Sequence, residues 1–243
     1  MRLEGKKALV TGASRGIGRA IALAYAAQGA DIAVTARKVE SLDSTAAEIK
    51  ALGRNVYAMA WDVRDVSQVD ERLAEAKEAL GGLDIVVNNA GVARLPKDHP
   101  APTPEALWDY VMDINIKALH FVSQGAVKLM QEQGGGIIIN MASDAGLRGA
   151  PSPYGVSKWG VVGFTRGLAK QVAQHGIRVN AIGPGPVATE MMDCEPGKPV
   201  ESPRLPLGRY ALAEEIAGIA LFLATDDSAA VFGETIVANT SNT

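Results

Sequence analysis

Residues 8–18 read ALVTGASRGIG. A short apolar run, residues 8–10, precedes Thr11, and glycines follow at positions 12, 16 and 18. A stretch of helical spacing begins at Arg15, within this glycine-rich turn. A strand, a glycine-rich turn and a helix N-terminus together form an anion site, because the free N–H groups and the dipole of the helix receive negative charge. The spacing G-x-x-x-G-x-G differs from the commoner G-x-G-x-x-G, and a plain tight turn is the alternative for the glycines taken alone.

Short apolar runs alternate with longer helical patterns along the rest of the chain. The expected strands are residues 8–10, 32–35, 56–60, 85–87, 137–140, 179–182 and 235–238. The expected helices are residues 15–28, 41–52, 66–80, 103–130, 154–174 and 213–224. The strands lack the alternation of half-exposed strands, which is typical of strands covered on both faces. The pattern predicts an α/β fold: a Rossmann-like, doubly wound parallel sheet of about seven strands with helices on both faces.

Length and composition narrow the class of protein. The 243 residues allow one sizeable core, and we find no linker or repeat that would divide residues 1–243. The net charge is -3 without a long basic run, so we expect no nucleic acid and no membrane as partner. We find neither a signal-peptide pattern nor a membrane-spanning stretch. Cys194 is the single cysteine, which excludes an internal disulfide and favours a cytoplasmic location.

The end of the second expected strand bears on cofactor choice. Dinucleotide folds that select NAD place an acidic residue near this point, and none lies between Ile32 and Val39. Arg37 lies about 20 residues past Gly18, where an arginine can bind the 2′-phosphate of NADP. Arg15 supplies a second positive charge beside it. The sequence therefore favours NADP(H), with two solvated surface arginines as the alternative.

Two segments carry residue types suited to proton transfer. Tyr154 and Lys158 lie four residues apart, on one face of the expected helix. A nearby ammonium lowers the pKa of a tyrosine from its usual value of about 10, so the pair can act as an acid and base. Ser143 follows the strand 137–140, at the sheet edge where ligands bind, and its hydroxyl can hydrogen-bond a substrate carbonyl. A packed tyrosine beside a surface lysine, and a turn serine, are the alternatives.

From about Leu3 to Ala238, these residues in this order resemble the classical short-chain dehydrogenase/reductase family. Further motifs carry the resemblance: Asp62-Val63, Asn88-Asn89-Ala90-Gly91, Asn115 in Met112-Asp113-Ile114-Asn115, and Asn180 to Gly185 with Thr189. The resemblance implies a single dinucleotide-binding and catalytic domain over residues 1–243. It also implies an NADP(H)-dependent oxidoreductase that interconverts a ketone and a secondary alcohol by hydride transfer.

The resemblance also implies roles for individual residues. Tyr154 gives a proton to the substrate oxygen, and Ser143 orients and polarises the carbonyl. Lys158 lowers the pKa of Tyr154 and binds the nicotinamide ribose, while Asn115 keeps a water in a proton relay. The implied cofactor-binding residues are Gly12, Ser14, Arg15, Gly16, Ile17, Gly18, Arg37, Asp62, Val63, Asn89, Ala90, Gly91, Tyr154, Lys158, Pro184, Gly185, Val187 and Thr189.

The sequence departs from the family pattern in three places. The segment from Ser143 to Tyr154 is shorter than usual, and Val237-Ala238-Asn239-Thr240 stands where relatives often have Val-Asp-Gly-Gly. Residues 128–133 are poor in the basic side chains that would meet an acyl carrier protein, although Lys170 remains. We therefore expect a small ketone or alcohol, such as a sugar acid, as substrate. The alternatives are a 3-oxoacyl-(acyl-carrier-protein) reductase and a non-catalytic NADP-binding regulator.

The remaining expectations concern the substrate pocket and assembly. Residues 189–209, with four prolines, are expected to form a mobile loop over the site. Pocket candidates are Ala93, Arg94, Asp144, Arg148, Pro151, Met191 and Met192, and either arginine can meet a carboxylate or remain solvated. We assign no metal, because His99 and Cys194 lack partners at metal-ligand spacing. Helices 103–130 and 154–174 match those that form two-fold interfaces in the family, so we expect a homotetramer.

Overall fold

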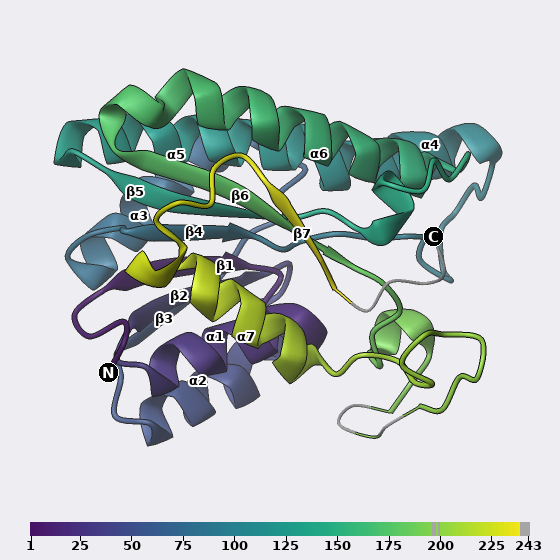
Figure 1. Cartoon of the computed structure of the whole chain (residues 1–243), viewed down its shortest axis with the longest axis horizontal. Helices are drawn as coiled ribbons and strands as arrows, with labels where there is room; N and C mark the ends of the chain where they lie inside the picture. The colour runs from purple at the N-terminus through teal and green to yellow at the C-terminus, as the bar shows by residue number, and fades with distance from the viewer. Residues whose placement is uncertain (196–197, 199, 239–243) are drawn as a thin grey trace.

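The computed structural model describes residues 1–195, 198 and 200–238 of the chain, and its strands form a parallel sheet (Figure 1). The strands are β1 (Lys7–Thr11), β2 (Asp31–Ala36), β3 (Val56–Ala60), β4 (Ile85–Asn88), β5 (Gly136–Met141), β6 (Ile177–Pro184) and β7 (Thr235–Ala238). Their order across the sheet is β3-β2-β1-β4-β5-β6-β7. This confirms the predicted doubly wound sheet of seven strands, with its order reversing between β1 and β4.

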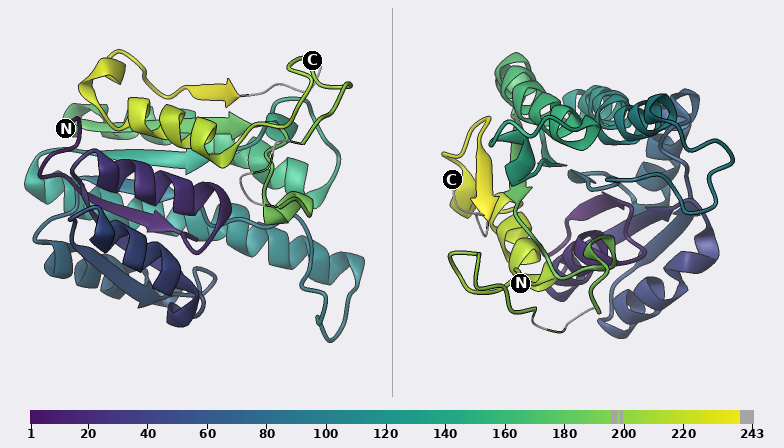
Figure 2. Two further views of the ribbon diagram at one scale, coloured as in Figure 1. Left: turned by 90° about the horizontal axis from the view of Figure 1, so that it is seen from below. Right: turned by 90° about the vertical axis from the view of Figure 1, so that its right-hand side faces the viewer.

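Helices cover both faces of the sheet (Figures 1 and 2). One face carries α1 (Gly16–Ala27), α2 (Asp43–Ala51) and α7 (Ala213–Leu223). The other face carries α3 (Val69–Leu80), α4 (Pro104–Met112), α5 (Leu119–Gln133) and α6 (Pro153–Val172). Short 3₁₀ turns connect these elements at Val39–Leu42, Val66–Gln68, Asp144–Gly146, Ala173–His175, Glu190–Met192 and Asp226–Ser228. No helix in the described ranges is long and apolar enough to cross a membrane.

The central strand β1 explains why the apolar runs are continuous. Successive side chains of a strand point to opposite faces of the sheet. Val10 accordingly packs in the core under α1 and α7, whereas Leu9 packs in the core under α3 and α5. Both side chains are fully buried, so helices cover both faces of β1 at these positions.

The expected helix 103–130 is the one long element that the structure changes. It divides into α4 and α5, with a π-helical turn between them at Asp113–Ala118, and it continues to Gln133. Gly134 then ends the helix in the left-handed conformation, at φ 85°. The π turn matters for the site because Asn115 lies within it.

The segment after β6 lies beyond the carboxyl ends of the strands (Figure 1). In its described part it contains the turn Glu190–Met192, and isolated bridges join Val187 to Ala211 and Glu201 to Arg209. Of the prolines expected in this loop, Pro196 and Pro199 lie outside the described residues. So do Asn239 and Thr240 of the unusual C-terminal motif.

Candidate functional site

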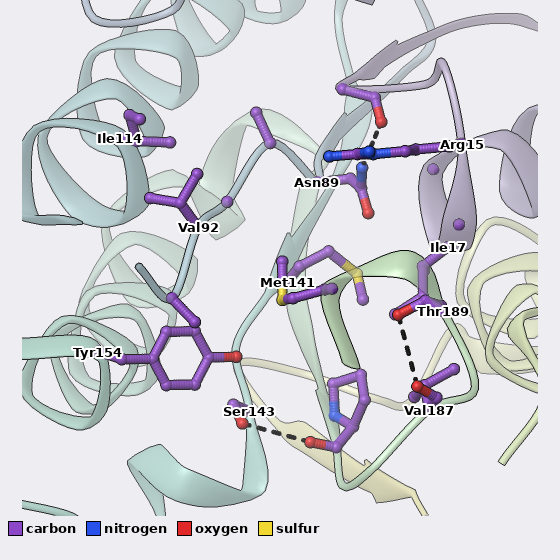
Figure 3. A pocket seen from close by; sticks show the side chains of 18 of the residues that line it. Arg15, Ile17, Asn89, Val92, Ile114, Met141, Ser143, Tyr154, Val187 and Thr189 are labelled. Carbon is purple, nitrogen blue, oxygen red and sulfur yellow. Dashed lines mark hydrogen bonds between the residues drawn. The ribbon is translucent and has the colours of Figure 1, made fainter. Parts of the chain in front are cut away.

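A cavity of about 480 Å³ opens at the carboxyl ends of the strands, where the strand order reverses (Figure 3). Its wall contains every residue that the sequence implied for cofactor binding, from the glycine turn to Thr189. It also contains Ser143, Tyr154 and Lys158. These side chains come from the ends of β1 to β6 and the start of α6, so the sheet edge gathers residues that are far apart in the sequence.

The glycine turn leaves room that side chains would fill. Gly12 and Gly16 have φ of 65° and 54°, a conformation that favours glycine. A Cβ at Gly18 would lie 2.3 Å from Nδ2 of Asn89. That amide donates to the backbone oxygens of Thr11 at 2.8 Å and Gly12 at 3.0 Å, and it thereby ties the end of β4 to the turn.

The first turn of α1 has no side-chain cap. Arg15 occupies the N-cap position, and its side chain makes no capping hydrogen bond. The N–H groups at this helix end are therefore available to an anion. Together with the close backbone approach at the glycines, this fits the pyrophosphate of a dinucleotide.

Two arginines line the end of the cavity beside β2. Arg15 and Arg37 both contribute to its wall, and neither forms an ion pair within residues 1–195, 198 and 200–238. The residues between Ile32 and Val39 include no carboxylate. This end of the cavity therefore presents positive charge.

Asp62 lies near Arg37 and has a partner that the sequence did not predict. Its carboxylate binds Arg64 at 2.6 Å, and the hydrogen bonds from Arg64 hold the pKa of Asp62 below its usual range. The Arg64 guanidinium in turn stacks over the ring of Tyr110, 5.4 Å from the ring centre. Asp62 thus remains ionised, and its side chain is connected to α4.

Tyr154 and Lys158 lie on the first turns of α6, as their spacing predicted. Ser152 caps this helix by accepting a hydrogen bond from the backbone N–H of Gly155 at 3.1 Å. Figure 3 shows the Tyr154 hydroxyl pointing into the cavity on the side of Ser143. The short segment between the two residues has therefore not separated their hydroxyl groups.

Glycines explain how this short segment fits. A Cβ at Gly146 would lie 2.5 Å from the backbone carbon of Lys158, and one at Gly155 would lie 2.2 Å from the backbone oxygen of Ala150. Any side chain at either position would push the segment away from α6. The absence of both side chains lets the segment pack directly on the helix that carries Tyr154.

Ser143 is the N-cap of the turn Asp144–Gly146, and three groups besides Tyr154 contact its hydroxyl. The oxygen accepts from the backbone N–H of Ala145 at 3.2 Å. The hydroxyl donates to Oδ1 of Asp144 at 3.2 Å or to the backbone oxygen of Pro184 at 3.3 Å, the contact drawn in Figure 3. A hydroxyl has one hydrogen, so these two acceptors compete for it.

Lys158 is buried, and its amine points toward the sheet. Nζ donates to the backbone oxygen of Met141 at 2.7 Å and lies 5.7 Å from the centre of the Tyr154 ring. Burial lowers the pKa of Lys158 to about 8, because the low dielectric disfavours the charged form.

The lowering of the Tyr154 pKa that the resemblance implied is not seen in this structure. Burial raises the pKa of Tyr154 above its usual value, since the phenolate would lose its hydration. Hydrogen bonding with Ser143 acts in the opposite direction, and the nearby charge of Asp144 raises the pKa further. Tyr154 is therefore a protonated hydroxyl at neutral pH.

Asn115 is the one predicted catalytic residue that does not line the cavity. Its buried amide donates to the backbone oxygen of Val92 at 2.8 Å and accepts from the N–H of Val92 at 2.8 Å. It also donates to the hydroxyl of Ser157 at 3.1 Å. Asn115 thus joins the segment after β4 to α6, behind the wall that carries Tyr154.

The substrate candidates divide into two groups. Ala93, Asp144, Arg148, Met191 and Met192 line the cavity, whereas Arg94 and Pro151 do not. Both arginines, for which contact with a substrate carboxylate and solvation were the two alternatives, already have acidic partners in the protein. Arg94 binds Asp193 with contacts of 2.7 and 3.0 Å, and Arg148 binds Asp144 at 3.2 Å.

Sequence reasoning missed several wall residues: Thr35, Ala36, Trp61, Val92, Tyr110, Ile114, Met141, Ala142, Ala145, Pro186 and Glu190. The four-residue spacing of Tyr110 and Ile114, just before Asn115, was a signal that one helix face meets the site. Met141 ends β5 two residues before Ser143, which also placed it at this edge of the sheet.

Comparisons with known proteins agree with this geometry. A family model described as short chain dehydrogenase matches residues 6–197. The 3-oxoacyl-(acyl-carrier-protein) reductase FabG of Thermotoga maritima is 39% identical, with 97% of each chain covered. The D-threitol dehydrogenase of Mycolicibacterium smegmatis is 40% identical, covering 97% of this chain and 92% of that protein.

A solved structure agrees as well. A short chain dehydrogenase from Burkholderia cenocepacia J2315 in complex with NADP has a TM-score of 0.86 and 33% identity, with 98% of each chain covered. The family match spans most of the chain, and the identities extend over nearly its full length. This chain therefore belongs to the short-chain dehydrogenase/reductase family and is an oxidoreductase that acts on CH–OH groups with NAD(P).

Proposed function

We propose that this protein is an NADP(H)-dependent oxidoreductase that interconverts a small ketone and a secondary alcohol. We also propose that residues 1–243 form a single domain that both binds the dinucleotide and carries the catalytic residues. The observation that carries the proposal is the single cavity lined by the glycine turn, the two arginines, Ser143, Tyr154 and Lys158.

Residues of the protein have different roles at the reacting carbonyl group. The bound cofactor supplies or accepts the hydride. Tyr154, protonated at neutral pH, donates its hydrogen to the carbonyl oxygen, and Ser143 donates a second hydrogen bond to the same oxygen. Lys158 holds positive charge beside the Tyr154 ring, and Asn115 fixes the wall against which the site is built.

NADP(H) rather than NAD(H) is supported by charge. Arg37 and Arg15 line the cavity without an ion-pair partner in the described ranges, and an arginine fork suits a phosphate. The end of β2 lacks the carboxylate that would accept hydrogen bonds from the ribose of NAD. The NADP complex of the Burkholderia relative is consistent with this preference.

A 3-oxoacyl-(acyl-carrier-protein) reductase is the second candidate, and the name of the Thermotoga maritima relative favours it. The surface of α5, before the fifth strand, speaks against it. Lys128 on α5 pairs with Asp70 at 3.2 Å, which reduces the positive charge open to an acidic carrier protein. The name of the D-threitol dehydrogenase relative favours a small substrate.

We propose a homotetramer located in the cytoplasm. The helices α4, α5 and α6 expose the large apolar side chains of Trp108, Phe121, Val156 and Trp159. Exposed apolar residues on one helical layer are typical of an association surface. Closed two-fold symmetry through these helices would bury them in pairs.

A substrate panel tests the proposal. NADPH or NADH is combined with small ketones or with a 3-oxoacyl thioester of acyl carrier protein, and loss of nicotinamide absorbance is followed. We expect turnover of a small ketone with NADPH that exceeds turnover with NADH. A kcat/KM for the carrier-protein thioester far above that of every small ketone would favour the second candidate. A protein that binds NADPH but reduces neither class would favour a non-catalytic regulator.

A further inference from the structure

An ion pair lies directly beside Ser143 in the cavity wall. Asp144 is buried, with 6% of its surface exposed, while the side chain of its partner Arg148 is 41% exposed. Oδ2 of Asp144 contacts Arg148 at 3.2 Å, and Oδ1 lies 3.2 Å from Oγ of Ser143. Both residues of the pair line the cavity.

The backbone fixes this arrangement. Asp144 begins the 3₁₀ turn that Ser143 caps, and Arg148 lies four residues further along in the cavity wall. The turn is held against α6 by the close packing of Gly146 on Lys158. The carboxylate therefore stays next to the serine that contacts the reacting oxygen in the proposed function.

We propose that Asp144, acting beside Ser143, selects neutral substrates that carry a hydroxyl group on the carbon next to the reacting carbon. These substrates are α-hydroxyketones in reduction and vicinal diols in oxidation. The inference rests on the proposed function, because it assigns the reacting oxygen to Ser143 and Tyr154.

The spacing of the two side-chain oxygens supports this selection. Vicinal oxygens of a diol lie about one hydrogen-bond length apart, close to the 3.2 Å between Oγ of Ser143 and Oδ1 of Asp144. A substrate whose reacting oxygen meets Ser143 would place a neighbouring hydroxyl next to Asp144. A carboxylate is a strong acceptor for that hydroxyl.

The competition for the Ser143 hydrogen gives an energetic reason for the proposed selection of substrates with a neighbouring hydroxyl group. When Ser143 donates to a substrate carbonyl, its hydrogen is no longer shared between Asp144 and Pro184, so the buried carboxylate of Asp144 loses this donor. Losing a hydrogen bond to a buried charged group is unfavourable. A hydroxyl on the substrate replaces the lost hydrogen bond, whereas a plain ketone does not.

The same pair disfavours two other substrate classes. A keto acid would place its carboxylate near Asp144 and would compete with Asp144 for Arg148. An apolar chain would remove water from an ion pair without offering hydrogen bonds. The pair therefore narrows the proposed substrates to neutral, polar molecules.

Four ketones on one carbon skeleton test the inference: butanone, acetoin, erythrulose and acetoacetate. The rate is followed with saturating NADPH in the wild type and in Asp144→Asn and Asp144→Ala. We expect kcat/KM for acetoin to exceed that for butanone by about tenfold to a hundredfold, as one hydrogen bond to a charged group predicts. Erythrulose should behave like acetoin, and acetoacetate should be poorer than butanone.

The variants separate recognition from folding. The ratio of acetoin to butanone should fall to near one in Asp144→Ala and should be intermediate in Asp144→Asn, which keeps an oxygen acceptor. Butanone is the internal reference, so a general loss of active protein cancels in the ratio. Asp193→Asn removes a carboxylate from the other ion pair, Arg94–Asp193, and should leave the ratio unchanged.

The outcomes distinguish the inference from the proposed function. Equal kcat/KM for butanone and acetoin in the wild type, or an unchanged ratio in Asp144→Ala, would overturn the selection but leave the ketone reductase intact. Preference for acetoacetate that is lost in Arg148→Ala would assign Arg148 to a substrate carboxylate instead. Absence of turnover of all four ketones with either cofactor would contradict the proposed function, and the inference would fall with it.

Discussion

Nζ of Lys158 donates a 2.7 Å hydrogen bond to the backbone oxygen of Met141, so the lysine that follows Tyr154 on α6 is anchored to the end of β5. The amine is buried between the helix and the sheet, and burial lowers the pKa of Lys158 to about 8. The protein thus holds a charge at this position at a cost in stability.

The stability of Lys158→Met relative to the wild type should therefore be greater at pH 7 than at pH 10.5. The folded pKa of about 8 lies below the ordinary value of 10.5, so the unfolded chain binds more protons between these values. The penalty is fully present below pH 8 and disappears as the pH rises to 10.5, and it is on the order of 3 kcal/mol at most.

Thermal unfolding midpoints at equal protein concentration measure this effect. The advantage of Lys158→Met should shrink steadily between pH 8 and the ordinary lysine value. A difference in unfolding midpoint between Lys158→Met and the wild type that stays constant across this pH range would mean that the buried charge does not cause it. The variant should also lose turnover, which separates the stability of this position from its catalytic use.

Arg37→Asp should weaken the use of NADPH and improve the use of NADH. The kcat/KM for NADPH should fall about tenfold to a hundredfold, because a charge-assisted contact to the 2′-phosphate is lost. Lys38→Asp is the matched control, since it makes the same charge change at a residue outside the cavity wall. Equal effects of the two variants on the two kcat/KM values would show that cofactor preference depends on the overall electrostatic field of the protein and not on a contact with Arg37.

Trp159→Glu should dissociate the proposed tetramer. Trp159 on α6 is 69% exposed in the isolated chain and belongs to the same helical layer as the other exposed apolar residues. A charge buried in a two-fold interface would be desolvated twice, once in each half of the interface. Sedimentation should show smaller species for Trp159→Glu, whereas Leu52→Glu, on a different surface, should sediment like the wild type. A wild type that is monomeric at micromolar concentration would contradict the proposed assembly.

Asp31→Asn should reduce stability at neutral pH. Burial acts to raise the pKa of Asp31, but hydrogen bonds from Lys7 and Asn55 outweigh it and lower the pKa to about 2. The ionised carboxylate therefore stabilises the fold at pH values above 3.8, the ordinary pKa of an aspartate. This stabilisation is lost as the pH falls toward 2.

The expected loss for Asp31→Asn is on the order of 2 kcal/mol at pH 7. Wild type and variant should converge in stability near pH 2. Asp70→Asn breaks the exposed pair with Lys128 and should change stability by less than about 1 kcal/mol. Denaturant unfolding measures the stability of both proteins across the acid range. A stability difference between the wild type and Asp31→Asn that does not depend on pH would contradict this role of the Asp31 carboxylate.

The sheet and the cavity wall could be predicted from the sequence because both rest on local patterns. A continuous apolar run such as residues 8–10 indicates a strand covered on both faces, and the residues after each strand meet at one sheet edge. The glycine turn, Ser143 and Tyr154 are positioned by this rule. Their roles in cofactor binding and catalysis remain predictions.

The features that the sequence did not predict depend on contacts between residues that are far apart along the chain. The π turn around Asn115 arises where its amide binds Val92, 23 positions earlier, and nothing in its local pattern differs from an ordinary helix. The raised pKa of Tyr154 reflects burial, which spacing does not show. The Arg94–Asp193 pair joins residues 99 positions apart, beyond any local pattern.

Turnover by Tyr154→Phe on a confirmed ketone tests the central claim most directly. The substitution removes only the hydroxyl group that points into the cavity on the side of Ser143, so unfolding and NADPH binding should be nearly unchanged. We predict a fall in kcat of about 10²–10⁴-fold, the usual contribution of general acid catalysis. Wild-type turnover in a folded Tyr154→Phe protein that still binds NADPH would contradict the assignment of Tyr154 as the proton donor.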